Sequence, residues 1–192
     1  MRGITKGCSE IATTTDTTAV TTDTLTTTSS FLTYENPAFN IKLDYPSDWQ
    51  AWSGNDTFDP SGLANVATFF SPEDDDYASF VLYVEDLSVS GTSKNLDDYL
   101  DASINMYKDT YSGFKLNSSD TDQTIAGSSA YSLTGMYDDS SRGKLNMGDT
   151  GTISGDLAYS IQYSASPVKY AQYLPTIEKM INSLELTGET AE

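Results

Sequence analysis

Two kinds of hydrophobic periodicity alternate along the chain after residue 30, and their order leaves few folds open. Between residues 39 and 45, apolar side chains stand at every second position, which is the repeat of a β-strand with one buried face. Residues 65–70 and 79–85 are further apolar runs of strand length. The second of these holds five apolar residues in succession, Phe80 to Val84. Such a run predicts a central strand that is covered on both faces.

The spacing of an α-helix first appears in residues 95–113. Its apolar stripe consists of Leu96, Leu100, Ile104, Tyr107 and Tyr111. Asn95 is a suitable N-cap, the aspartates in the first turn suit the helix dipole, and Gly113 fits the C′ position. A second helix is predicted where Ser166 is followed by Pro167 at the first helical position. Pro175 predicts a kink or a break in that helix.

The strand pattern returns between the two helices. Residues 123–137 predict a hairpin that turns at Gly127, and residues 144–166 predict two strands that meet at Gly155. The order of strands, helix, strands and helix, with short connections, predicts an α+β fold. Its centre is a largely antiparallel β-sheet that is flanked by helices. We also expect Trp49 and Trp52, which follow the first strand, to pack against the core.

Residues 1–30 differ in composition from the rest and are predicted to be a disordered linker. Thr13 to Thr28 is threonine-rich with three apolar residues, too few to offset the chain entropy of folding. The preceding "KGCSE" is similar to the mature start of a lipoprotein, which predicts a lipid tether at Cys8. No apolar signal segment precedes Cys8, so a tail with an incidental cysteine is the alternative. Residues 31–186 are the predicted domain, and residues 187–192 a frayed end.

Charge and residue types exclude several classes of function. The chain has 10 Lys and Arg against 28 Asp and Glu, a formal net charge of -18. Such a surface repels nucleic-acid phosphates and anionic lipid headgroups. Histidine is absent, which removes imidazole catalysis and histidine-ligated metals. Cys8 is the single cysteine, so the chain has no intrachain disulfide and no core thiol nucleophile.

The row Glu73, Asp74, Asp75 and Asp76 is the candidate metal site. Carboxylate oxygens are ligands that calcium and manganese accept, and a bound divalent ion would relieve the repulsion between neighbours. The row lacks the alternating spacing of an EF-hand loop. The alternative is an ordinary solvated loop between two core strands.

Two other carboxylate groups are candidates for acid–base catalysis in a hydrolase: Asp138 with Asp139, and Asp97 with Asp98 and Asp101. The helix dipole also explains the helical group, and a turn explains the other. The 13 tyrosines are candidates for a carbohydrate or peptide groove, but many stand at alternating strand positions that predict core.

Several local strings, taken in order, resemble PsbP-like domains. Residues 31–49, "FLTYENPAFNIKLDYPSDW", resemble the opening of such domains, where an aromatic-rich strand leads into a Tyr-Pro-x-x-Trp turn. "FFSP" before an apolar strand and the hairpin "TIAGSSAYSLTG" are similar to the next landmarks. "GTISGDLAYSIQYSAS" and "YLPTIEKMINSLEL" resemble the closing strands and helix. The resemblance covers about residues 31–186.

The resemblance implies an α/β/α sandwich of the PsbP/Mog1 type and non-enzymatic work. Photosynthetic members are extrinsic lumenal subunits of photosystem II that help retain calcium and chloride, and related domains are secreted or lipid-anchored. The acidity and the lack of histidine depart from the photosynthetic members, so the photosystem role does not carry over. We therefore predict a monomeric, non-catalytic binding or assembly module at the cell surface, with a protein or cell-surface partner and a weak calcium or manganese contact. A hydrolase and a passive surface domain are the alternatives.

Overall fold

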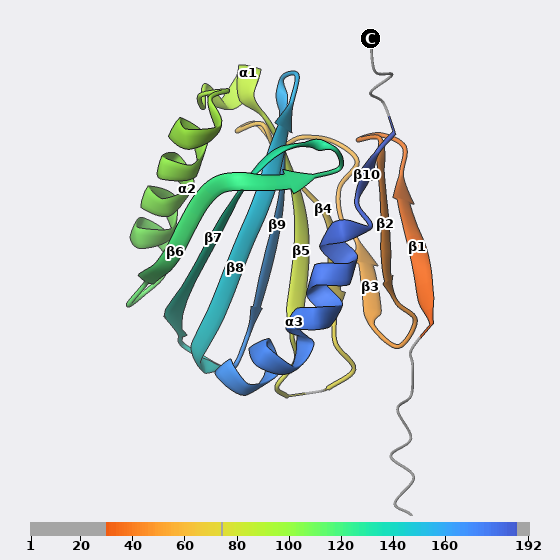
Figure 1. The fold of residues 1–192 in the computed structure, drawn as a ribbon, viewed down its shortest axis with the longest axis vertical. Helices are drawn as coiled ribbons and strands as arrows, with labels where there is room; N and C mark the ends of the chain where they lie inside the picture. The colour runs from red at the N-terminus through yellow and green to blue at the C-terminus, as the bar shows by residue number, and fades with distance from the viewer. Residues whose placement is uncertain (1–29, 74, 188–192) are drawn as a thin grey trace, which may run out of the picture.

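The computed structural model describes residues 30–73 and 75–187, and the predictions for residues 1–29, the lipid tether at Cys8 included, lie outside this part. Within the described residues, ten strands form two sheets that are accompanied by three helices (Figure 1). The strands are β1 (Phe31–Asn36), β2 (Ile41–Pro46), β3 (Gln50–Ser53), β4 (Leu63–Phe70), β5 (Ser79–Asp86), β6 (Lys115–Ile125), β7 (Ser128–Asp139), β8 (Gly143–Ser154), β9 (Leu157–Ala165) and β10 (Glu185–Leu186). The helices are α1 (Leu87–Ser90), α2 (Leu96–Thr110) and α3 (Pro167–Asn182).

The larger sheet has seven strands in the order β3-β4-β5-β9-β8-β7-β6, and the smaller sheet has the order β1-β2-β10. Every strand pair in both sheets is antiparallel. The predicted fold class is therefore confirmed. For most pairs the connections explain this, because the strands are joined by hairpins that are too short for a parallel crossover.

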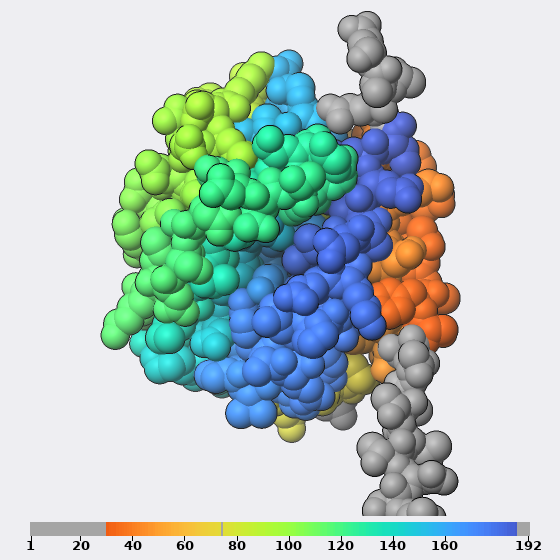
Figure 2. All heavy atoms as spheres, in the orientation of Figure 1, coloured from red at the N-terminus to blue at the C-terminus, as the bar shows by residue number. Residues whose placement is uncertain are grey.

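Helices α2 and α3 cover opposite faces of the large sheet. On one face, Ile177 and Met180 of α3 join a core that includes Leu82 of β5 and Ile161 of β9. The small sheet also packs into this core, and Figure 2 shows the atoms of α3 filling the middle of this face between β6 and β1. On the other face, α2 packs over β7 and β8 in a second core.

Helix α2 covers only part of its face, and the sequence did not predict this. Along β5, Phe80, Leu82 and Val84 are all 0% exposed on the α3 side. Val81 and Tyr83, which point to the α2 side, are only half-buried. The prediction that this strand is covered on both faces is therefore wrong. Its apolar run continues onto a surface that α2 leaves partly open.

Both predicted helices are present. The Asn95 side chain caps α2 by accepting from the Asp98 amide, and Pro175 lies inside a single α3. Trp49 is buried as predicted, but Trp52 is 59% exposed, so its predicted packing is wrong. No helix among the described residues is long and apolar enough to cross a membrane.

Candidate functional site

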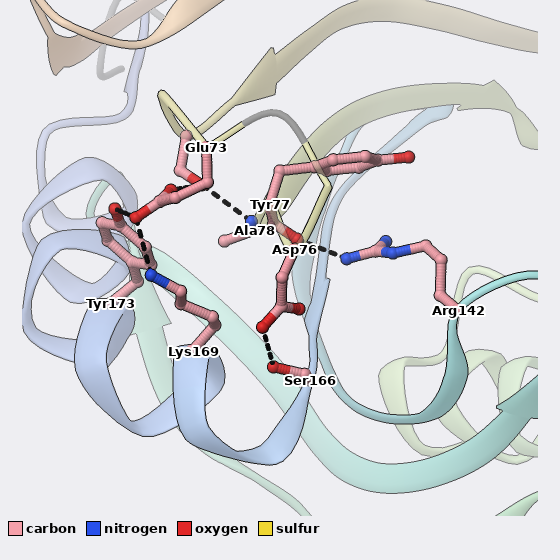
Figure 3. Close-up of polar contacts among 9 residues, drawn as sticks. Glu73, Asp76, Tyr77, Ala78, Arg142, Ser166, Lys169 and Tyr173 are labelled. Carbon is pink, nitrogen blue, oxygen red and sulfur yellow. Dashed lines mark hydrogen bonds and ion pairs between the residues drawn. The ribbon is translucent and has the colours of Figure 1, made fainter.

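The acidic row lies in the loop between β4 and β5, against the first turns of α3 (Figure 3). Both oxygens of Glu73 are occupied there. Its Oε1 accepts hydrogen bonds from Lys169 Nζ at 2.8 Å and from the Tyr173 hydroxyl at 2.6 Å. Its Oε2 accepts from Ser71 Oγ at 2.6 Å. Glu73 therefore ties the loop to α3.

The partners of Glu73 also set its charge. Burial alone would raise the pKa of this carboxyl group, but the hydrogen bonds from Lys169, Ser71 and Tyr173 outweigh burial and lower the pKa to about 2. The side chains of Glu73 and Lys169 are 29% and 20% exposed, so water screens this ion pair only in part. The pair is a structural contact of the folded protein.

The other members of the row have fewer contacts. Asp76 accepts from Ser166 Oγ at 2.9 Å, Asp75 is exposed, and Asp74 lies outside the described residues. No group of three or more potential ligands converges on one point in the part of the chain that the structure describes. The calcium or manganese contact stays a prediction, which a calorimetric titration of the full chain with either ion tests.

We expect Glu73→Gln to lower the free energy of unfolding by about 1–2 kcal/mol, because it leaves the Lys169 ammonium partly buried without its counter-ion. Thermal unfolding at pH 7 measures this. Asp75→Asn removes the same charge from an exposed position and should leave the melting temperature almost unchanged. Equal melting temperatures for the two variants would show that the ion pair stabilises nothing.

Four of the five carboxylates that were candidates for hydrolysis lie in contacts of their own, and the fifth, Asp101, is an exposed residue of α2. Asp138 pairs with Lys144 at 2.9 Å, and Asp139 accepts from two backbone amides of the turn that follows it. Asp97 accepts from Thr121 Oγ1 and Asp98 from Ser93 Oγ. These contacts explain the carboxylates without any catalysis.

The strongest candidate site is the part of the large sheet that α2 leaves uncovered. We call it the open face: the side chains of β3, β4, β5 and β9 that point to the α2 side, with those of β8 at its inner end beside α2. Strand register places one row of side chains across it, namely Trp52, Thr68, Val81, Gln162, Asp149 and Leu133. The row begins at the exposed Trp52 and ends beneath α2, where Leu133 is 1% exposed.

Aromatic side chains form a continuous ladder at the outer end of the open face. Trp52 meets Phe70 edge-on at 6.3 Å between ring centroids, and Phe70 meets Tyr77 in the same way at 5.1 Å. The guanidinium of Arg142 lies 4.1 Å from the centre of the Tyr77 ring and donates to the Tyr77 carbonyl (Figure 3). A hollow of about 790 Å³ adjoins the three aromatic rings. This is the kind of fixed, concave, aromatic surface that binds a partner.

The inner end of the open face holds a buried carboxyl group. Asp149 of β8 is 2% exposed, and it accepts from the hydroxyls of Tyr107 at 2.7 Å and Tyr131 at 3.2 Å. Burial raises the pKa of Asp149 to about 7, although the hydrogen bonds from both tyrosines act in the opposite direction.

Asp149 was not predicted as a site residue, although the alternation of apolar residues in β8 indicated it. Leu145, Met147 and Asp149 stand at alternate positions of β8 and share a face. An aspartate in phase with two buried apolar residues is a candidate buried carboxyl group. Trp52 and Tyr83 were missed as surface residues because their residue types also suit a core.

Known proteins resemble this chain in their three-dimensional structures. No protein-family model matches the sequence, and no curated protein matches it. The solution structure of cyanobacterial PsbP (CyanoP) from Synechocystis sp. PCC 6803 matches with a TM-score of 0.56 at 13% identity, covering 82% of this chain and 93% of CyanoP. The chain has the PsbP/Mog1 fold.

Two further structures share the PsbP/Mog1 fold with it. LpqN of Mycobacterium tuberculosis gives a TM-score of 0.54 at 14% identity over 82% of this chain and 90% of LpqN. Mog1p of Saccharomyces cerevisiae gives 0.53 at 9% identity over 83% of this chain and 96% of Mog1p. At these identities the likeness establishes the fold, and it confirms the fold that the PsbP-like strings predicted.

Proposed function

We propose that this domain is a non-catalytic binding module that works outside the cytoplasm and holds a partner on its open face. The observation that carries the proposal is the exposed aromatic ladder, in which Trp52 is 59% exposed beside the rings of Phe70 and Tyr77. Large aromatic side chains with arginine beside them are typical of the contacts that supply most of the binding energy in protein interfaces.

Proteins with the same fold support this kind of work. Mog1p is described as a Ran-binding protein, and LpqN as involved in cell envelope biogenesis. The threonine-rich segment and the similarity around Cys8 to a lipoprotein start support a position outside the cytoplasm, at the end of a tether. The net charge of -18 favours a partner with a basic or neutral surface.

The alternative of a carboxylate hydrolase has less support. The carboxylates that suggested it, such as Asp138 and Asp97, are held in surface contacts with Lys144 and Thr121. A passive surface domain differs from a binding module in one respect, because it needs no exposed aromatic ladder. The open face therefore favours the binding module.

A photo-crosslinking amino acid at position 50 tests this proposal on intact cells that express the full chain. Gln50 is exposed in β3 and lines the same hollow as Trp52, so the aromatic ladder stays intact. We expect one or a few defined adducts, because the open face would hold a specific partner beside Trp52. Position 168 is the matched control, since Val168 is 76% exposed on α3, away from the open face. The same adducts from both positions, or none from position 50, would overturn the proposal.

A further inference from the structure

A second hollow lies at the inner end of the open face, between α2 and the sheet. Its volume is about 610 Å³, which is the size of a small-molecule site. Five tyrosines line it: Tyr83, Tyr99, Tyr107, Tyr111 and Tyr131. Three exposed apolar residues, Leu63, Val89 and Met106, also line it and are 39–56% exposed. A ligand would therefore meet apolar side chains and tyrosine rings together.

Small residues in the sheet make room for this cavity. One row of the register runs Tyr83, Ser160, Gly151 and Tyr131 across β5, β9, β8 and β7. A Cβ atom on Gly151 would lie 2.9 Å from the ring of Tyr131, so the lack of a side chain lets that ring settle on the sheet. Between these two tyrosines Ser160 lines the floor of the cavity, and the Tyr131 ring covers Gly151.

Within the described part of the chain, the carboxyl groups that line the cavity have no basic side chain beside them in the lining. Glu85 and Asp149 both line it, and no lysine or arginine does among the residues that the structure describes. The side-chain donors to the Glu85 carboxylate are neutral hydroxyls, Tyr99 at 2.8 Å and Thr92 at 2.8 Å. A carboxylate has room for about four hydrogen bonds, so Glu85 can accept further ones. These two hydroxyls orient the Glu85 carboxylate but do not neutralise its negative charge.

We propose that this cavity binds a small organic ammonium ion that carries an apolar substituent. The ammonium group would lie beside the Glu85 carboxylate among the tyrosines, whose rings attract cations through their π-electrons. The apolar substituent would contact Leu63, Val89 and Met106. This site is separate from the aromatic ladder at Trp52, so either proposal can fail without the other.

Calorimetric titration of the full chain with choline, with octyltrimethylammonium and with 3,3-dimethylbutan-1-ol tests the ligand class. The last compound has the shape of choline but no charge. We expect both ammonium ions to bind, octyltrimethylammonium more tightly, and choline about 10-fold more tightly than the neutral alcohol. Equal affinity for choline and the neutral alcohol, or no heat from either ammonium ion, would overturn the proposal.

Matched variants locate the binding. Glu85→Gln keeps the shape of the side chain and should weaken octyltrimethylammonium binding about 10-fold, whereas Glu178→Gln removes an exposed charge from α3 and should leave it within about 2-fold. Tyr83→Phe keeps the ring and should retain binding, while Tyr83→Ala should lose it. Unchanged affinity in Glu85→Gln, or equal affinities in the two Tyr83 variants, would contradict a tyrosine-lined cation site.

Discussion

Leu82→Ala should lower the free energy of unfolding by about 2–5 kcal/mol, whereas Val81→Ala, one residue earlier in β5, should lower it by less than about 1 kcal/mol. Leu82 is 0% exposed in the core beneath α3, so its truncation leaves a cavity that the surrounding side chains cannot fill. Val81 is half-buried on the open face and borders solvent there. Chemical denaturation with urea measures both values in the same buffer.

The difference between the losses for Leu82→Ala and Val81→Ala tests whether α2 leaves β5 uncovered on one side. If the strand were covered on both faces, Val81→Ala would also leave a buried cavity, and its loss would come close to that of Leu82→Ala. A loss from Val81→Ala that approaches the loss from Leu82→Ala would therefore show that another segment covers the open face in solution. A small loss from Val81→Ala leaves that surface free for a partner.

The fold was predictable from sequence because its elements obey local rules. The stripe of α2 and its Asn95 cap were read correctly, since a helix with one buried stripe repeats every three to four residues. Strands β7, β8 and β9 were predicted from alternation and from turn glycines such as Gly155, which has a φ of 61°. Strands β1 and β3 and most of β6 were missed because their patterns are mostly exposed.

The candidate site was less predictable, for a physical reason. An apolar residue on a strand has the same residue type whether a helix covers it or a partner does, so Val81 and Tyr83 were assigned to the core. Only the length and position of α2 in three dimensions decide which half of the sheet stays open. Glu73 was a candidate metal ligand in the sequence, and its ion pair with Lys169 was not predicted because the two residues lie 96 positions apart. No local pattern predicts such a contact.

The largest pH effect is expected from Asp149. Burial raises its pKa to about 7 in the folded protein, above the usual aspartate value of 3.8. A raised carboxyl pKa means that the folded state binds the proton more tightly than the unfolded state does. Between these two pKa values the free energy of unfolding should therefore fall as pH rises, by about 1.4 kcal/mol per pH unit. Well below pH 3.8 the group is protonated in both states and contributes no slope.

The window from pH 5 to pH 7 isolates this group. The chain has no histidine, and the lowered pKa of Glu73, about 2, places its transition below the window. Across these two pH units the wild-type chain should lose about 2–3 kcal/mol, read from urea midpoints at each pH. Asp149→Asn can still accept from the Tyr107 hydroxyl but does not ionise, so its stability should stay level over the window. Asp75→Asn, an exposed control, should follow the wild type. Parallel curves for wild type and Asp149→Asn would mean that Asp149 is already ionised at pH 5, and that its burial between α2 and the sheet is less complete than the structure has it.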